Sequence, residues 1–140
     1  MRAKRIRNLL GNEKGQNLVE FALVAPLLLL LVIGIAEFGR AWMTKNILTG
    51  AAREAVRILA VKPPWPGGMT PLNRAQNILV SSGIIIPDSS IIIVNDNSME
   101  YSPVSVTVNY AFPVAIVGFI PGLDCTTIPL SSTTTMRREY

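Results

Sequence analysis

Several residue types on which enzymes and binding sites depend are scarce or absent in this sequence of 140 residues. There is no histidine, so the commonest general base and the commonest metal ligand are missing. The single cysteine, Cys125, excludes a disulfide within the chain and a cysteine cluster for zinc. Aromatic residues make up only 6%, which argues against a platform for stacking nucleic-acid bases. We therefore expect no catalytic residue, no metal site, no cofactor and no enzymatic activity.

An excess of basic over acidic side chains is also missing from most of the chain, although the net charge is +4. The excess lies entirely in residues 1–15, because residues 16–140 hold equal numbers of basic and acidic side chains. The charged residues of this leader are Arg2, Lys4, Arg5, Arg7, Glu13 and Lys14. A neutral body lacks the basic surface that binds phosphates, so nucleic acid is not an expected partner. No pattern for a small-molecule substrate is present, and no glycine-rich phosphate loop.

What the chain has instead is a long apolar run, FALVAPLLLLLVIGIA, at residues 21–36. Together with Leu18 and Val19 it approaches the roughly 20 residues that cross a bilayer, so we predict a membrane span at 18–37. Basic residues favour the cytoplasmic side of a span. The sequence thus predicts a single-pass protein of the cytoplasmic membrane, with residues 1–15 as a cytoplasmic leader and the C-terminal part outside.

Two other interpretations of the apolar run remain open. The run could be the buried core helix of a soluble protein, although a helix that is apolar on all sides fits lipid better. It could also be a secretory signal peptide, because Gly34-Ile35-Ala36 offers small residues for cleavage after Ala36. In that case the chain would be an exported binding domain. The run is longer than the usual core of a signal peptide, which favours the span.

Between the leader and the span lies Gly15-Gln16-Asn17-Leu18-Val19-Glu20. A carboxylate in an apolar segment is costly at the bilayer centre and less costly near its edge. Glu20 either lies at the aqueous interface or has a functional role. The second interpretation needs cleavage between Gly15 and Gln16, which would leave Glu20 one helical turn from a new terminal amine. The carboxylate could then pair with that amine, or with one on a neighbouring helix in a bundle.

The order of motifs from Gly15 onward resembles the TadE-like family, pseudopilin-like proteins of the tight-adherence (Flp) pilus system. Residues 15–57 carry the resemblance, together with a C-terminal Thr135-Met136-Arg137-Arg138-Glu139. The matching pieces are Gly15, Glu20, Phe21, Pro26, Glu37, Phe38, Gly39, Arg40 and the run Ala51-Ala52-Arg53-Glu54-Ala55. The resemblance implies a minor component of pilus assembly that a prepilin peptidase processes after Gly15. Pilus subunits or the assembly machinery would then be its partners.

The helix is expected to continue past the membrane, over residues 16–61 in all, until Pro63-Pro64 ends it. Apolar or small residues recur on one face of its second half. They are Phe38, Ala41, Leu48, Ala52, Ala55 and Leu59, with Lys45 at one position of the series. The small residues Gly50, Ala51, Ala52 and Ala55 form a patch that another helix can approach closely. Either the protein's own outer domain or a second molecule could cover this alanine patch.

The remaining residues predict a small α+β head at 70–140, after a loop at 62–69 rich in proline and glycine. Thr70-Pro71 is typical of a helix start and Gly83 of a helix end, which gives a short helix at 71–82. Residues 90–94 and 104–110 read as strands, and a third at 126–136 pairs back to complete an antiparallel sheet.

Three features of the head keep alternatives open. The apolar segment 113–123, PVAIVGFIPGL, either lies under the sheet or forms an exposed patch for membrane or partner. Cys125 is either a small buried residue or one half of an interchain disulfide. Several acidic and amide residues could be read as calcium ligands, but they lack the alternating ligand pattern and the glycine of a calcium loop, so a plain turn is preferred. These residues are Asp88, Asn95, Asp96, Asn97, Glu100 and Asp124.

Overall fold

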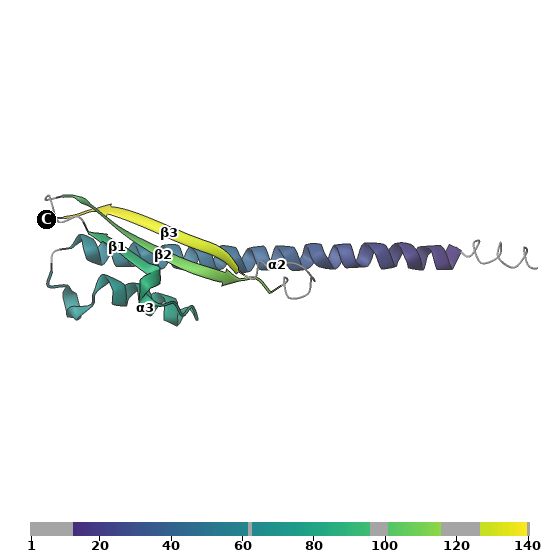
Figure 1. Cartoon of the computed structure of the whole chain (residues 1–140), viewed down its shortest axis with the longest axis horizontal. Helices are drawn as coiled ribbons and strands as arrows, with labels where there is room; N and C mark the ends of the chain where they lie inside the picture. The colour runs from purple at the N-terminus through teal and green to yellow at the C-terminus, as the bar shows by residue number, and fades with distance from the viewer. Residues whose placement is uncertain (1–12, 62, 96–100, 116–126, 140) are drawn as a thin grey trace, which may run out of the picture. The chain divides into compact units, whose positions relative to one another are not determined.

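The computed structural model describes residues 13–61, 63–95, 101–115 and 127–139. Its elements are α2 (Glu13–Ala60), the 3-10 turn η1 (Pro66–Gly68), α3 (Pro71–Ser81), the 3-10 turn η2 (Asp88–Ser90), β1 (Ile91–Asn95), β2 (Pro103–Pro113) and β3 (Thr127–Arg137) (Figure 1). The chain divides into two compact units, residues 1–37 and residues 38–140, and each is described by itself. The α+β fold class predicted from the sequence is confirmed: a long apolar helix is followed by a short helix and a three-stranded antiparallel sheet.

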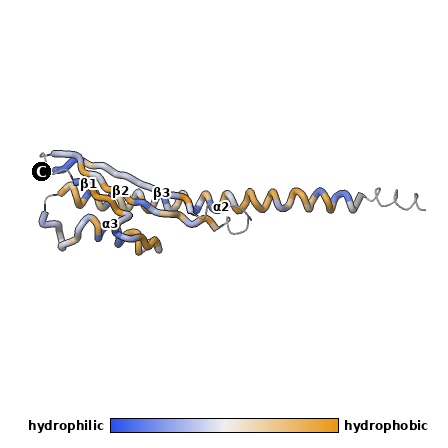
Figure 2. Tube along the Cα trace, in the orientation of Figure 1, coloured by the Kyte–Doolittle hydropathy of each residue, from blue (hydrophilic) through white to orange (hydrophobic). Residues whose placement is uncertain are grey.

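Helix α2 begins at Glu13, three residues before the predicted start, and ends at Ala60. Glu13 and Lys14 have good helix propensity, which explains why the helix extends past Gly15. Pro26 lies inside the helix. The run of leucines and valines in the first unit is uniformly apolar (Figure 2). Within the described residues, α2 is the one helix long and apolar enough to cross a membrane.

The apolar side chains of α2 in the first unit are exposed to their surroundings. Leu18, Phe21 and Leu27 are each about 70% exposed, and the five leucines from Leu27 to Leu31 all remain more than half exposed. A water-soluble protein rarely leaves an apolar patch of this extent uncovered. This burial pattern does not fit the interpretation of residues 21–36 as a buried core helix, and it fits a single membrane span.

The second unit has one hydrophobic core, to which α2, α3 and the sheet all contribute. The C-terminal part of α2 provides Leu48, Ala51, Ala52, Ala55, Val56, Leu59 and Ala60, α3 provides Ala75 and Leu79, and the residues from Ile84 onward provide Ile84, Ile91, Val104, Val106 and Val108. In the sequence, alternation of valine with serine and threonine on β2 marked the face that packs inward. The three valines of β2 are fully buried, as that pattern predicts.

The sheet has the order β1-β2-β3, and both pairings are antiparallel. At its centre Val106 lies opposite Ile93 on β1 and Thr134 on β3. On the other face of the sheet Thr107 and Thr133 are direct partners, and their hydroxyl oxygens lie 2.8 Å apart. Strand β2 runs three residues further than predicted, to Pro113, because β3 pairs with it along its whole length.

Helix α3 begins and ends as its sequence predicts. The Thr70 hydroxyl accepts a hydrogen bond of 3.1 Å from the Asn73 amide, and Pro71 occupies the first helical position. At the other end Gly83 has a φ of 77°. Its amide donates to the Val80 carbonyl at 3.0 Å, and the Ile84 amide donates to the Leu79 carbonyl at 2.8 Å. These two bonds form a Schellman motif, which needs a left-handed residue at Gly83.

Replacing Gly83 by alanine is therefore expected to destabilise the second unit by about 1–2 kcal/mol, since a side chain raises the energy of the left-handed conformation. Gly50→Ala is the matched control, because Gly50 is helical and a Cβ there meets nothing within 4 Å. That control is expected to stabilise the unit by about 0.5–1 kcal/mol. Urea unfolding of the detergent-solubilised chain, followed by tryptophan fluorescence, measures both. Equal midpoints for the two variants would contradict the assignment of the Gly83 cap.

Candidate functional site

The predicted cleavage position lies in the first turn of α2. Gly15 is the third residue of the helix, and the exposed Gln16 follows it. The first four amides of a helix have no partner within the helix, and glycine has low helix propensity. This end of α2 therefore unwinds more easily than the middle of the helix. Gly15 and Gln16 both lie within the helix, so cleavage of the bond between them would require local unwinding.

Glu20 lies four residues after Gln16 on the same helix, and its side chain is exposed. Residues four apart lie on the same face of a helix, one turn from each other. The helix thus places the Glu20 carboxylate one turn from the nitrogen that cleavage would turn into a terminal amine. A carboxylate at this spacing is within reach of such an amine on the same helix.

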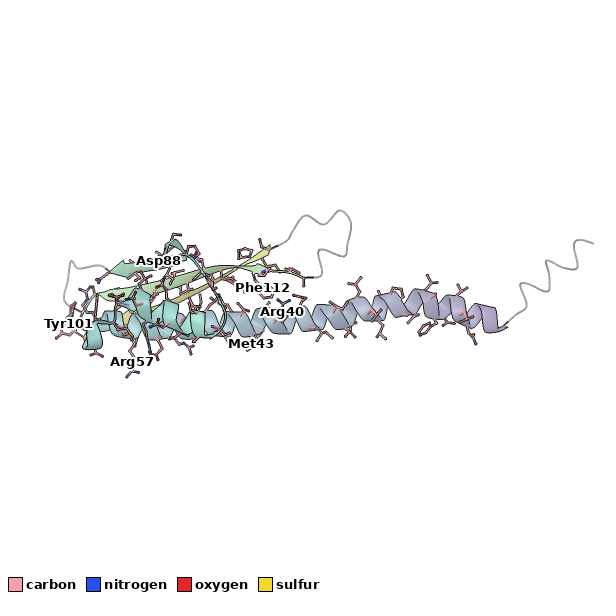
Figure 3. The ribbon with its side chains drawn as sticks, turned by 90° about the horizontal axis from the view of Figure 1, so that it is seen from below. Arg40, Met43, Arg57, Asp88, Tyr101 and Phe112 are labelled. Carbon is pink, nitrogen blue, oxygen red and sulfur yellow. The ribbon has the colours of Figure 1, made fainter. Side chains whose placement is uncertain are left out.

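The family motif residues are distributed over both units of the structure. Phe21, Pro26 and Glu37 belong to the first unit, and Phe21 is 70% exposed. Phe38, Gly39 and Arg40 belong to the second unit. The Arg40 guanidinium lies 5.3 Å from the centre of the Phe112 ring, at the end of β2 (Figure 3). This cation–π contact attaches the end of the sheet to α2.

The expected apolar stripe of α2 is confirmed at its C-terminal end and wrong at its first member. Leu48, Ala52, Ala55 and Leu59 are buried, whereas Phe38 is 68% exposed. Phe38 instead stacks on the exposed Trp42, with ring centres 6.2 Å apart and planes inclined by 27°. Burial on this face starts only at Leu48, which sets the limit of the core along α2.

A groove lies beside this aromatic pair, within the second unit. Phe38, Ala41, Trp42 and Lys45 of α2 form one wall, and Pro129, Leu130 and Ser131 of β3 form the other. Its volume is approximately 420 Å³. The Lys45 ammonium donates a hydrogen bond to the Ser131 carbonyl and closes one side of the groove. We call this hollow the Trp42 groove. The sequence did not predict this groove, because no local pattern indicates that β3 lies beside this part of α2.

Polar contacts attach β3 and the residues after it to the rest of the second unit. The hydroxyl oxygens of Thr49 and Ser132 lie 2.9 Å apart. The Glu139 amide donates to the Ala60 carbonyl at 3.0 Å, which satisfies a carbonyl at the end of α2 that has no partner within the helix. Glu139, at the end of the segment that carries the C-terminal resemblance, therefore closes the end of α2.

Arg138 is the buried charged residue of this closure, with 5% of its surface exposed. Its guanidinium donates to the side-chain carbonyl of Asn95 on β1, and its amide donates to the Ser102 carbonyl at 3.1 Å. Arg137 beside it is exposed and lies over the Tyr101 ring at 5.6 Å. The two arginines thus fix the end of β3 and the residue after it against β1 and against the residues before β2.

The alanine patch is covered by the protein itself. Ala51, Ala52 and Ala55 are fully buried in the core with residues of α3 and the sheet, and Gly50 is half-buried. Of the two alternatives left open by the sequence, packing against the protein's own domain is the one that the structure shows for the three alanines.

The acidic residues considered as calcium ligands do not form a site in the part of the chain that the structure describes. No group of three or more metal-ligating side chains occurs among those residues. Asp88 accepts a hydrogen bond from the Gln76 amide group, and Asn95 accepts one from Arg138. Asp96, Asn97, Glu100, Asp124 and Cys125 lie outside the described residues, as do residues 116–123 of the apolar segment.

Comparison with protein families gives a match over part of the chain. The family model described as TadE-like protein matches residues 15–57, about a third of the chain. This confirms the resemblance over the segment from Gly15 to Arg57, which includes the apolar run, Glu20, Arg40 and the alanine patch. No curated protein and no solved structure matches the chain.

Proposed function

We propose, from the match of residues 15–57 to the TadE-like family, that this chain is a minor pilin-like component of a tight-adherence pilus. The observation that carries the proposal is that the matched segment lies within α2 and includes both the apolar run and the start of the folded unit. A subunit of this kind is structural and performs no catalysis. The energy for assembly comes from other machinery, since the sequence has no nucleotide-binding loop.

In this proposal residues 18–37 span the cytoplasmic membrane, residues 1–15 lie in the cytoplasm and the second unit lies outside. The exposed apolar surface of α2 in the first unit and the basic leader support this arrangement. The folded unit then contacts pilus subunits or assembly machinery outside the membrane. A prepilin peptidase removes the leader after Gly15, which frees the Gln16 amine one turn from Glu20.

Deletion of the gene from its native cells tests the proposal. We expect tight-adherence pili, counted by electron microscopy, to be lost and then restored by a plasmid copy of the gene. The chain is expected in the membrane fraction of the complemented cells. Normal pili in the deletion strain would contradict a role in assembly. A soluble chain that begins at Glu37 would instead support the exported binding domain.

Glu20→Gln in the plasmid copy tests the role of the carboxylate, because it keeps the shape of the side chain and removes the charge. If Glu20 pairs with the terminal amine, this variant is expected to remain in the membrane and to restore fewer pili than the wild type. Glu54→Gln is the matched control. Glu54 lies on α2 within the folded unit, where its carboxylate is 3.2 Å from Arg74. Equal numbers of pili for both variants would argue that Glu20 only lies at the interface.

A further inference from the structure

A cluster of large apolar side chains remains exposed in the second unit, although that unit has its own core. Phe38, Trp42 and Met43 are between 61% and 68% exposed, and all three lie within two turns of α2. Phe38 and Trp42 stack on each other and do not enter the core. Figure 3 places Met43 on the same stretch of helix as Arg40. Exposed apolar groups gathered in this way indicate a surface that is covered in the working protein.

The position of the cluster along α2 indicates what covers it. The predicted span ends at residue 37, and Trp42 follows five residues later in the sequence. Five residues of helical chain extend about 7.5 Å at 1.5 Å per residue. The polar layer on each side of a bilayer is about 5–8 Å thick, so Trp42 falls at the level of the headgroups. Tryptophan is enriched at this level, because its ring is apolar and its N–H is polar.

The charge near the cluster fits phospholipid headgroups. Lys45 lines the Trp42 groove and uses one of its three N–H donors on the Ser131 carbonyl. The remaining donors can bind a phosphate oxygen. The groove therefore combines apolar walls for the upper part of an acyl chain with a cation for the phosphate.

We propose that the Trp42 groove, with the exposed Phe38 and Met43 beside it, binds phospholipid at the membrane surface on the C-terminal side of the span. This inference rests on the membrane span of the proposed function and adds a second lipid contact that belongs to the folded unit. It explains why Phe38 is exposed where helical periodicity predicts burial. The bilayer covers the apolar groups that the core leaves free.

The two tryptophans of the chain allow a direct test. Trp65 lies in the loop after α2, and its N–H donates to the Val61 carbonyl, which keeps it at the end of the helix away from the groove. The Trp65→Phe variant reports on Trp42 alone, and Trp42→Phe reports on Trp65 alone. Each full chain is reconstituted in phosphatidylcholine vesicles whose acyl chains carry bromine, which quenches nearby tryptophan fluorescence. Bromine is placed either near the carbonyl end or near the methyl end.

We expect bromine near the carbonyl end to quench Trp42 several times more strongly than Trp65, and more strongly than bromine near the methyl end. Equal, weak quenching of both tryptophans would overturn the proposal, as would stronger quenching of Trp42 from the methyl end. Flotation of the vesicles separates this failure from failure of the span. A chain that floats without quenching of Trp42 retains its span but not the groove contact. A chain that does not float has neither.

The role of Lys45 is tested with brominated phosphatidylglycerol in the same vesicles. In the Trp65→Phe background, Lys45→Gln is expected to reduce the added quenching of Trp42 that this anionic lipid causes. Arg57→Gln is the control, because Arg57 is an exposed basic residue on α2 that does not line the groove. Inorganic phosphate alone is expected to change neither variant. Two results would indicate a protein partner and overturn the proposal. One is an equal loss of Trp42 quenching in Lys45→Gln and Arg57→Gln. The other is Trp42 fluorescence that depends on the protein-to-lipid ratio and not on bromine.

Discussion

Replacing Gly15 by leucine is expected to prevent removal of the leader, so that the chain isolated from native membranes keeps residues 1–15. The wild-type chain is expected to begin at Gln16. Two physical effects act in the same direction. Leucine raises the helix propensity of the first turn by about 1 kcal/mol, which opposes the unwinding that cleavage needs. It also places a bulky side chain beside the bond to be cleaved, where the wild-type glycine has no side chain.

Intact-mass spectrometry measures this prediction directly, because it does not depend on a free amine at Gln16. Charge gives an independent measurement, since the leader carries the entire net charge of +4. Isoelectric focusing should therefore show the wild-type chain at a clearly lower isoelectric point than the Gly15→Leu chain. Gly15→Ala separates the two effects, because it raises helix propensity with little added bulk.

Gly11→Leu is the matched control, since Gly11 is the other glycine of the leader. This variant is expected to lose its leader as the wild type does. The prediction fails if the Gly15→Leu chain is shortened as completely as the wild type. A wild-type chain that starts at Met1 would keep the membrane anchor and contradict processing at Gly15.

Replacing Leu79 by alanine has the largest expected effect on stability. Leu79 is 1% exposed and lies in the core with buried residues of α2 and the sheet. Its carbonyl also accepts the hydrogen bond that ends α3. Removing a buried leucine side chain costs about 2–5 kcal/mol, because apolar burial is lost and a cavity remains. A small unit has little stability in reserve, so this loss is a large share of the total.

Val80→Ala is the matched control, because Val80 is the next residue of the same helix and is 61% exposed. Its expected effect is within about 0.5 kcal/mol, as for most surface substitutions. Urea unfolding in detergent, followed by tryptophan fluorescence, compares the two variants. Similar midpoints for Leu79→Ala and Val80→Ala would show that α3 does not pack against the core as described.

Local patterns explain what could be predicted from the sequence. Thr70, Pro71 and Gly83 each act within their own turn, so the bounds of α3 follow from neighbouring residues. The alternating valines of β2 give a strand with a buried face, because successive side chains point to opposite sides. The apolar run of α2 can likewise be recognised from neighbouring residues, without knowledge of the rest of the fold.

Contacts between distant residues explain what was missed. Periodicity alone placed Phe38 on the buried stripe, but burial on α2 starts where the sheet and α3 cover it. The Trp42 groove depends on Lys45 meeting Ser131, and these residues are far apart in the sequence. The alanine patch shows a different limit. Small residues allow close approach equally well to the protein's own sheet and to a second molecule, so their sequence could not decide between the two.

The position of β3 in the chain has a consequence for biosynthesis. Synthesis proceeds from the N-terminus, so α2, α3, β1 and β2 all leave the ribosome before β3 does. Until β3 arrives, β2 has a long unpaired edge that can pair with other chains. Contacts such as that between Glu139 and Ala60 then form last. The folded unit therefore matures only after translation has passed β3, and a chaperone that shields β2 would act in the interval before that.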